Sequence, residues 1–332
     1  MTTSSSPTPT ETTVINGSMQ AAVIEQYGSP DVFEIRNIAP PQVKADQVLI
    51  RVYASSVNPI DWKIRKGMLK LLPGQKFPMV LGFDIAGEVV ATGVQVTHLN
   101  VGDAVYAYSN QFPGGAYADY AAVSEKVTAA KPENLSYPEA ASIPLAATTA
   151  LQALRDAGKL NAGQRVLING ASGGVGIFAV QIAKLFGAEV TAVCSTQNID
   201  LVNRFSPDRV IDYKQTDFTQ EAASYDLVFD VVGSKPYSDC KRILTGTGIY
   251  VTTQPDPKNY LQGLLTSVLP GQTAKVILAK ANRVDLIYLK EQIETGKIRP
   301  IIDRTYPLSE IAAAHAYSEE GHVVGKIAIT MV

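Results

Sequence analysis

The chain has 332 residues, which suggests two domains at about 150 residues each. Hydrophobic residues make up 46% of it and charged residues 18%, so it can bury substantial cores and is not disordered as a whole. A net charge of −2 argues against a nucleic-acid partner or an anionic membrane surface. Two cysteines exclude a disulfide scaffold and a cysteine-rich metal site, and so few thiols fit a cytoplasmic protein. No apolar stretch approaches the roughly 20 residues needed to span a bilayer.

Residues 1–18 are rich in Ser, Thr and Pro and carry one charge, at Glu11. They lack the basic start and apolar core of a signal peptide, and they lack the arginines of an organelle transit peptide. We interpret this segment as a disordered tail.

Residues 19–143 follow a pattern of short strands separated by turns. The expected strands are rich in Val, Ile, Ala and Tyr and lie at 20–25, 47–55, 84–92 and 104–108. Pro, Gly, Asn and Asp separate them. This pattern predicts a compact β-rich domain.

Between residues 144 and 281 strands and helices alternate. A helix is expected at 145–158, and then a strand at 165–169, a helix at 175–186, a strand at 190–194, a helix at 199–205, strands at 209–213 and 227–232, a helix at 236–244 and a strand at 248–253. Such alternation, with nearly continuous apolar strands, is typical of a parallel sheet covered by helices on both faces. The fold class is therefore α/β, with a doubly wound parallel-sheet domain that binds a nucleotide.

Residues 282–332 hold expected helices at 286–295 and 308–318 and a closing strand at 326–331. A closing strand suits a β-rich partner better than a completed parallel sheet. We therefore expect this segment to return to the first domain.

A glycine-rich turn stands between the strand at 165–169 and the helix that follows it. In this context Gly173 allows the backbone to approach a pyrophosphate, and Gly176 allows the helix to pack closely on the strand. The first N–H groups of the helix favour negative charge. The residues expected to hold the cofactor here are Ala171, Ser172, Gly173, Gly174, Val175 and Gly176.

The end of the next strand indicates which cofactor binds. A site that prefers NADH places Asp or Glu there to hold the ribose diol. This chain instead has Ser195 followed by Thr, Gln and Asn, so no carboxylate would repel a 2′-phosphate. The sequence therefore favours NADPH.

Several ordered segments resemble the zinc-independent branch of the medium-chain dehydrogenase/reductase superfamily, in its quinone oxidoreductase and enone reductase group. The resemblance covers everything but the tail. Its segments are 57–63 (VNPIDWK), 81–89 (LGFDIAGEV), 101–105 (VGDAV), 115–120 (GAYADY), 144–150 (PLAATTA), the glycine-rich turn and 325–327 (GKI).

The resemblance implies a GroES-like β-rich catalytic domain, formed by 19–143 with 282–332, and an inserted Rossmann domain at 144–281. It places Asn58 near the nicotinamide ribose and Thr148 at the nicotinamide side of the cofactor. Ser195 and Tyr213 are placed near the 2′-phosphate. Many relatives have a lysine where this chain has Asn198, a departure that weakens the inference of NADPH without reversing it.

Zinc-dependent relatives have Gly-His-Glu where this chain has Gly82, Phe83 and Asp84, and they carry an early catalytic cysteine and four closely spaced structural cysteines. Cys194 and Cys240 are interpreted as buried apolar residues, so we expect no metal site. Without a zinc ion to polarise an alcohol, the expected reaction is reduction of a quinone or an α,β-unsaturated carbonyl by NADPH.

The expected catalytic residues are Lys63 and Asn58. Lys63 is the candidate to stabilise oxyanion charge, the alternative being a solvated surface lysine. Asp84 either helps to order the cleft expected between the two domains or caps a turn, and we favour the turn cap. Trp62, Phe83 and a loop at 260–269 are candidates for an apolar substrate wall.

Two alternatives remain at this point. The Tyr237 and Lys241 pair matches the short-chain carbonyl reductases, but it stands at an unusual place in the chain, and we interpret both as helix-surface residues. A crystallin-like or regulatory NADPH-binding protein without significant catalysis is the other alternative. We also expect a homodimer, formed through an apolar edge strand at 274–279.

Overall fold

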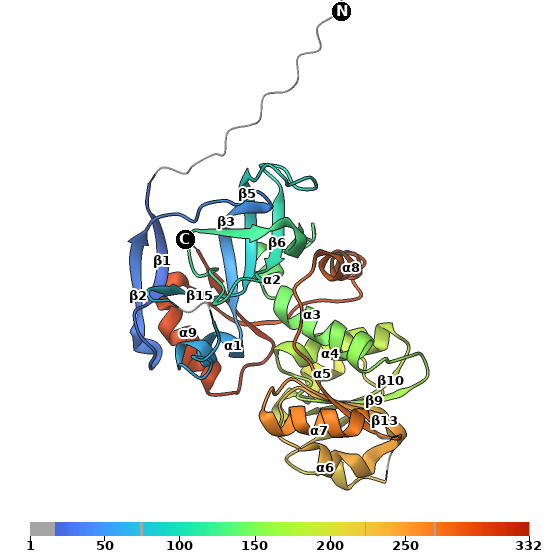
Figure 1. Cartoon of the computed structure of the whole chain (residues 1–332). Helices are drawn as coiled ribbons and strands as arrows, with labels where there is room; N and C mark the ends of the chain where they lie inside the picture. Colours follow the sequence, from blue (N-terminus) through green and yellow to red (C-terminus); the bar gives the residue numbers. More distant parts are fainter. Residues whose placement is uncertain (1–16, 74–75, 223, 269, 332) are drawn as a thin grey trace, which may run out of the picture.

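The computed structural model describes residues 17–73, 76–222, 224–268 and 270–331. The tail expected at 1–18 lies outside these residues except for its last two positions. Two units form the molecule: a β-rich unit that contains both ends of the described chain, and a unit built on a parallel sheet (Figure 1). The fold class expected from the sequence, a GroES-like β-rich domain with a Rossmann-type parallel-sheet domain, is confirmed.

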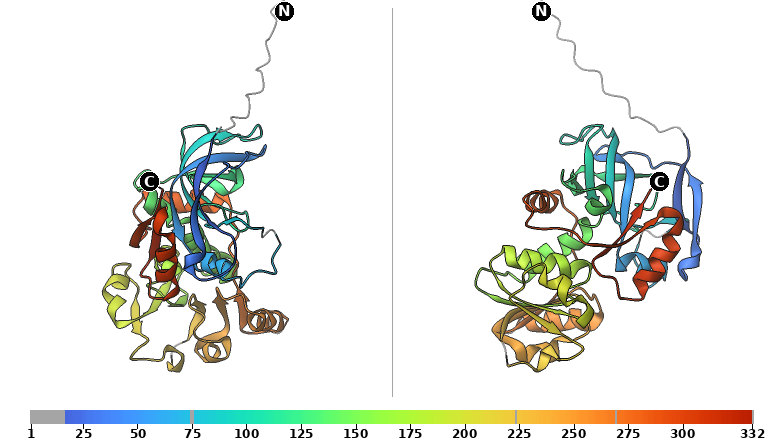
Figure 2. Two further views of the ribbon diagram at one scale, coloured as in Figure 1. Left: turned by 90° about the vertical axis from the view of Figure 1, so that its left-hand side faces the viewer. Right: turned by 180° about the vertical axis from the view of Figure 1, so that it is seen from behind.

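Segments from both ends of the chain build the β-rich unit. Its largest sheet has the order β15 (Ile302–Pro307), β16 (Lys326–Thr330), β3 (Gln47–Val57), β5 (Asp84–Thr92), β6 (Ala104–Tyr108) and β8 (Thr128–Ala130), and β7 (Tyr120–Ser124) also pairs with β3. A three-stranded sheet has the order β2 (Phe33–Ile38), β1 (Met19–Ile24) and β4 (Met79–Val80). β16 runs antiparallel to β3 and places Ile327 opposite Val57. Figure 2 shows the red C-terminal segment within this unit from two further sides.

Helices interrupt the β-rich unit, so the expectation of strands and turns alone is wrong there. They are α1 (Pro59–Arg65) and α2 (Tyr137–Ala141), whereas α9 (Ile311–Glu319), near the C-terminus, confirms the helix expected at 308–318. α1 and α2 each have a proline in the first turn, and a carboxylate in that turn accepts a hydrogen bond from the N-cap backbone. For α1 the donor is Asn58 N and the acceptor is Asp61 Oδ2, at 2.7 Å. These start signals are short and lie inside segments rich in turn residues, where they were overlooked.

The second unit contains a six-stranded parallel sheet. Its order is β11 (Arg209–Asp212), β10 (Glu189–Cys194), β9 (Arg165–Asn169), β12 (Tyr225–Asp230), β13 (Leu244–Thr252) and β14 (Thr273–Val276). This is the order of dinucleotide-binding sheets, in which the first strand is central. The helices of this unit and of its connection to the β-rich unit are α3 (Pro144–Gln152), α4 (Gly174–Leu185), α5 (Ile199–Asn203), α6 (Tyr237–Cys240), α7 (Pro257–Ser267) and α8 (Arg283–Glu294).

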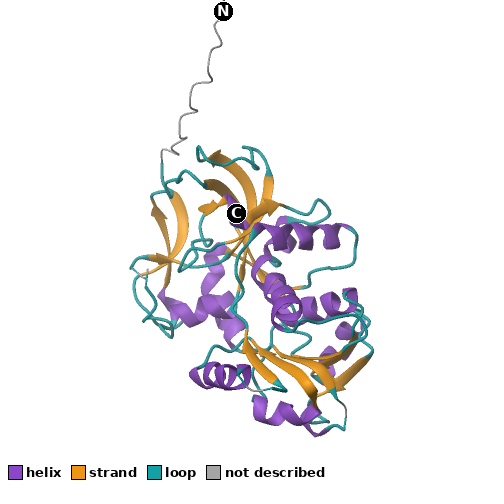
Figure 3. Ribbon diagram, turned by 45° about the vertical axis from the view of Figure 1, so that its right-hand side comes forward, coloured by secondary structure: helices purple, strands orange, loops and turns teal. Residues whose placement is uncertain are grey.

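Alternate residues of the central strands face opposite sides of this sheet. Val166 and Ile168 belong to a core shared with α3 and α4, whereas Leu167 and Val193 belong to a core shared with α6. Both faces are therefore buried, which explains why these strands have few polar residues. Figure 3 shows helices on both sides of the sheet.

Two expectations for the C-terminal part of this unit need correction. Residues 260–269 were expected to form a loop, but most of this segment belongs to helix α7. The edge strand expected at 274–279 is shorter and lies at Thr273–Val276. Asp256 begins α7 by accepting a hydrogen bond from Asn259 N at 2.8 Å, an N-cap signal that the sequence analysis did not use.

Replacing Gly176 with Ala should destabilise the protein, because a Cβ atom there would lie 2.0 Å from the carbonyl oxygen of Gly170. Backbone cannot move aside as a flexible side chain can. We expect the melting temperature to fall by about 5 °C or more. Gly246→Ala is the control, because its Cβ would have no atom within 4 Å. Equal melting temperatures for the two variants would contradict this account of the turn.

Candidate active site

A hollow of about 810 Å³ opens at the carboxyl ends of the parallel strands. Asn169, Cys194, Tyr213 and Val231 line it, and each lies at or just after the end of a different strand. Residues 321–323, between α9 and β16, form its wall on the side of the β-rich unit. In open α/β sheets this edge is where nucleotides bind.

The structure brings some of the predicted cofactor residues into this hollow and leaves others outside its lining. Ser172, Gly173, Ser195 and Tyr213 line it. Ala171 and Gly176 are buried behind the turn, and Gly174 and Val175 begin α4. Asn58, Lys63 and Thr148 lie elsewhere, on α1 and its N-cap and on α3.

The turn fits a dinucleotide pyrophosphate. Gly173 is the N-cap of α4 and offers no side chain to the first N–H groups, and the first turn contains no acidic residue. A phosphate can therefore accept hydrogen bonds that no side chain supplies. Gly170 has φ +87°, which a residue with a side chain rarely adopts, so the chain can turn sharply there.

Thr148 provides a second observation that fits a ligand. Its side chain is 1% exposed, and its Oγ1 atom has no hydrogen-bond partner among the described residues. A buried hydroxyl without a partner is costly, so a ligand that accepts or donates there would remove the penalty.

The hollow is also lined, beside Tyr213, by cations that the sequence analysis missed. Lys214 and Lys235 both line it. Lys235 pairs with Asp217 at 3.0 Å, whereas Lys214 forms no ion pair within the described part of the chain. Asn198 Nδ2 donates to Ser172 Oγ at 3.0 Å, so this amide holds the glycine-rich turn. Lys214 directly follows Tyr213 in the sequence, so its place in the lining of the hollow could have been predicted from that of Tyr213.

A buried polar network centred on Asp84 connects the two units. Asp84 Oδ2 accepts hydrogen bonds from Ser56 Oγ at 2.5 Å and Asn58 Nδ2 at 2.7 Å. Asp84 Oδ1 accepts one from Leu145 N, in the first turn of α3, at 2.7 Å. Lys326 Nζ lies 3.6 Å from Asp84 and donates to Asn58 Oδ1 at 2.5 Å. Asp84 therefore caps a helix and also orients Asn58, whereas the sequence analysis had favoured a turn cap alone.

A second buried group, formed by Asp61, Tyr117 and His315, supports the N-cap of α1. Asp61 Oδ2 accepts hydrogen bonds from Asn58 N and, at 3.1 Å, from Tyr117 OH, whose oxygen lies 3.3 Å from His315 Nε2. Burial raises the pKa of Asp61 to about 7, with a smaller contribution from the Asp84 charge. Burial also lowers the pKa of His315 to about 3, so this ring is neutral near pH 7.

Lys63 crosses from the β-rich unit toward the parallel-sheet unit. It is half-buried, its Nζ lies 3.5 Å from Gln254 Oε1, and it stands over the ring of Trp62 at 5.6 Å. Burial lowers the pKa of its ammonium group. Lys63 is therefore not a freely solvated surface lysine. Phe83 is 6% exposed and belongs to the core of the β-rich unit, which removes it from the expected substrate wall.

Neither Tyr237 nor Lys241 lines the hollow. Tyr237 is 6% exposed, and its ring packs at a tilt against that of Tyr250 with 5.9 Å between the ring centroids. Its interpretation as a helix-surface residue is wrong, because the first turn of α6 faces the sheet. The structure does not assemble a short-chain type of tyrosine and lysine pair. Cys194 and Cys240 are buried free thiols, as predicted.

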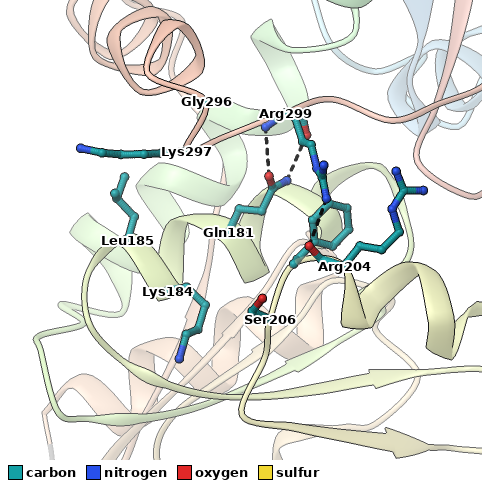
Figure 4. Close-up of a pocket in the computed structure, with 9 residues that line it drawn as sticks. Gln181, Lys184, Leu185, Arg204, Ser206, Gly296, Lys297 and Arg299 are labelled. Carbon is teal, nitrogen blue, oxygen red and sulfur yellow. Dashed lines mark hydrogen bonds between the residues drawn. The ribbon is translucent and has the colours of Figure 1, made fainter.

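A second hollow of about 350 Å³ lies elsewhere on the molecule, near α4, the turn after α5 and the segment that follows α8 (Figure 4). Its lining includes Lys184, Arg204, Lys297 and Arg299. Gln181 fixes its wall, because it accepts from Arg299 N at 2.9 Å and donates to Arg299 O at 3.0 Å. None of the predicted site residues lines this hollow, so the larger one is the candidate site.

Comparisons with known proteins agree with this architecture. Residues 44–133 match the family model of the alcohol dehydrogenase GroES-like domain, and residues 206–329 match that of the zinc-binding dehydrogenases. A spinach quinone-oxidoreductase homolog, described as chloroplastic, is 36% identical over 324 residues, which covers 91% of this chain and 95% of that protein. The chain belongs to the medium-chain dehydrogenase/reductase superfamily, in its quinone and enone reductase group.

Other members of the group show the same likeness. The chloroplastic NADPH-dependent alkenal/one oxidoreductase of Arabidopsis thaliana is 35% identical over 324 residues, which covers 94% of this chain and 79% of that protein. The structure of the quinone oxidoreductase from Coxiella burnetii superimposes with a TM-score of 0.86 at 32% identity and covers 95% of this chain and all of that one.

The description of one matched family implies zinc, but the residues present do not fit such a site. Across the residues that the structure describes, no group of three or more His, Cys, Asp or Glu side chains could hold a metal ion. Phe83 stands beside Asp84 in the segment where zinc-dependent relatives have histidine, and its side chain lies in the core.

The raised pKa of Asp61 predicts that the stability of the protein depends on pH. Between its unfolded value near 4 and its folded value of about 7, the native state binds more protons, so its contribution to stability falls as pH rises through this range. Asp61→Asn keeps the acceptor and cannot titrate. The melting temperature of the variant relative to wild type should therefore rise by a few degrees from pH 5 to pH 8. An unchanged difference across this range would show that Asp61 does not titrate as described.

Proposed function

We propose that this protein is an NADPH-dependent reductase of quinones or α,β-unsaturated carbonyls. The observation that carries the proposal is the junction of the two units at the glycine-rich turn, where Gly325 N donates to Ser172 O at 2.8 Å and Lys326 holds Asn58. A cofactor on the turn would extend along this junction toward Asn58 and Thr148. The names of the relatives in both branches of the group support the same reaction class.

When bound, the cofactor would supply a hydride to an electrophilic carbon or quinone ring. Negative charge then develops on the acceptor oxygen, and the Lys63 ammonium, which reaches from α1 toward Gln254, would stabilise it. Gln254 would hold Lys63 in place through the 3.5 Å contact. Water would supply the proton that completes the reduction. An enolate oxygen gains more from a nearby ammonium than the delocalised phenolate oxygen of a hydroquinone anion does, so Lys63 favours the enone slightly.

Several features support NADPH over NADH. Ser195, Tyr213 and Lys214 line the hollow together, and Lys214 has a charge that no described carboxylate neutralises at ion-pair distance. A 2′-phosphate would accept hydrogen bonds from such groups. In many relatives a lysine at the position of Asn198 lies near the 2′-phosphate. The Asn198 amide here is hydrogen-bonded to Ser172, so Lys214 would supply the positive charge for that phosphate instead.

Fluorescence titration should show tighter binding of NADPH than of NADH. Lys214→Gln should weaken NADPH binding about tenfold and leave NADH unaffected, because only NADPH has the 2′-phosphate. Ser195→Asp should shift the preference toward NADH. Lys258→Gln, a lysine outside the lining of the hollow, is the matched control. Equal or tighter binding of NADH by the wild type would contradict the cofactor assignment.

A panel of quinones, alkenals, ketones and alcohols tests the reaction class. Quinones or enones should be reduced with NADPH, and Lys63→Ala should lower kcat/KM about a hundredfold without changing the dissociation constant of NADPH. Lys70→Ala, an exposed lysine on the same segment, should leave turnover unchanged. Alcohol oxidation without quinone or enone turnover would defeat the proposal. Tight NADPH binding without any turnover would favour the crystallin-like or regulatory alternative.

We also propose a homodimer. β14 is an edge strand of the parallel sheet, and the neighbouring helix α7 has an exposed apolar stripe made of Tyr260, Leu261, Leu264, Leu265 and Val268. Pairing of two β14 edges would cover polar backbone and part of this stripe.

Light scattering at micromolar concentration should therefore give twice the mass of one chain. Lys275→Pro, in the middle of β14, should shift the protein toward the monomer, because proline removes a ladder hydrogen bond. A monomeric wild type would contradict the dimer.

No helix in the described part of the chain is long and apolar enough to cross a membrane. The cytoplasmic compartment stays a prediction, since the plant relatives named above are described as chloroplastic.

A further inference from the structure

Lys326 is a buried lysine whose ammonium group lies 3.6 Å from the Asp84 carboxylate and also contacts Asn58. It is 3% exposed and is the first residue of β16. Burying an ammonium group is costly, and apolar residues of similar volume often replace buried ion pairs without loss of stability. The contacts of this lysine therefore suggest a role besides folding.

Its ammonium group fixes which way the Asn58 amide points. Lys326 Nζ donates to Asn58 Oδ1 at 2.5 Å and to Val57 O at 3.2 Å. On the other side of the amide, Asn58 Nδ2 donates to Asp84 Oδ2 at 2.7 Å. The amide oxygen faces a cation and the amide nitrogen faces a carboxylate, so a flip of the amide would make both contacts repulsive. The second N–H of the amide remains for a ligand.

The stem of the same side chain lies against the glycine-rich turn. A Cβ atom at Gly174 would lie 2.9 Å from Lys326 Cδ, which means that this stem covers the first residue of α4. The backbone adjoins the turn as well, because Gly325 N donates to Ser172 O and Gly173 forms a parallel bridge with Gly325. One residue thus contacts both the turn that would hold the pyrophosphate and the amide that would face the nicotinamide ribose.

We propose that Lys326 is a positioning residue that sets the orientation of Asn58 relative to the glycine-rich turn, and that it acts on the cofactor through Asn58 alone. The inference rests on the proposed function, because it assigns Asn58 to the cofactor. It predicts that the loss of Lys326 misaligns the nicotinamide while the pyrophosphate end still binds.

A double-mutant cycle tests this inference with Asn58→Ala, Lys326→Met and the double variant. Each single variant should lower kcat by about tenfold to a hundredfold with the dissociation constant of NADPH changed less than about threefold. The double variant should be no slower than Asn58→Ala, because both changes remove the same alignment. The emission and lifetime of bound NADPH should change alike in all three variants. Lys131→Met removes a lysine that binds Pro132 O and Leu135 O, and it serves as the matched control.

Chemical rescue of the Lys326→Ala variant by an amine distinguishes this positioning role from a purely structural one. Propylammonium matches the removed atoms, and it should restore both kcat and the emission of bound NADPH in a saturable way. If the losses of Lys326→Met and Asn58→Ala multiply in an active enzyme, or if no amine restores the signal, Lys326 does not act through Asn58. If the wild type binds NADPH but reduces none of the substrates, the reaction class fails, while the emission of bound NADPH still decides this inference. If the wild type binds no nicotinamide cofactor, both fall together.

Discussion

The carboxylate of Asp84, buried where the two units meet, is the constraint on which the rest of the site depends. An ionised carboxylate is expensive to bury unless hydrogen bonds and a cation satisfy it. Here Ser56 Oγ, Asn58 Nδ2, Leu145 N and the Lys326 ammonium do so, and they belong to β3, the N-cap of α1, α3 and β16. Any movement of one of these elements against the others would break a charge-assisted hydrogen bond inside the protein.

The hydrogen bonds around Asp84 matter for the proposed function, because the elements that they join carry the residues proposed to face the cofactor. α3 carries Thr148, β16 adjoins the glycine-rich turn through Gly325, and α1 begins beside Asn58 and carries Lys63. Residues that are far apart in the sequence therefore keep a fixed geometry through this network. Preorganised donors of this kind are what hydride transfer to an electrophile requires, since they need not rearrange when charge develops.

Much of this arrangement could be predicted from the sequence where the pattern is local. The strands at 84–92, 104–108 and 165–169 coincide with β5, β6 and β9, because periodicity and flanking turns determine such elements. The glycine-rich turn and Lys63 were singled out from sequence motifs, and their roles stay predictions. Asp84 and Lys326 were not recognised as partners, because 242 positions of chain separate residues that only the pairing of β16 with β3 and β5 brings together. Helix α7 was taken for a loop, although its Asp256 N-cap, the proline in its first turn and the helical spacing of its apolar residues were signals in the sequence.

The most direct test of the central claim is a crystal structure of the NADPH complex. We expect the pyrophosphate on the N–H groups at the start of α4, the 2′-phosphate beside Ser195 and Lys214, and the nicotinamide ribose within hydrogen-bond distance of Asn58 Nδ2. Thr148 Oγ1 should gain a partner on the nicotinamide side. A cofactor bound in the smaller cationic hollow, or a nicotinamide that contacts neither Asn58 nor Thr148, would contradict the claim.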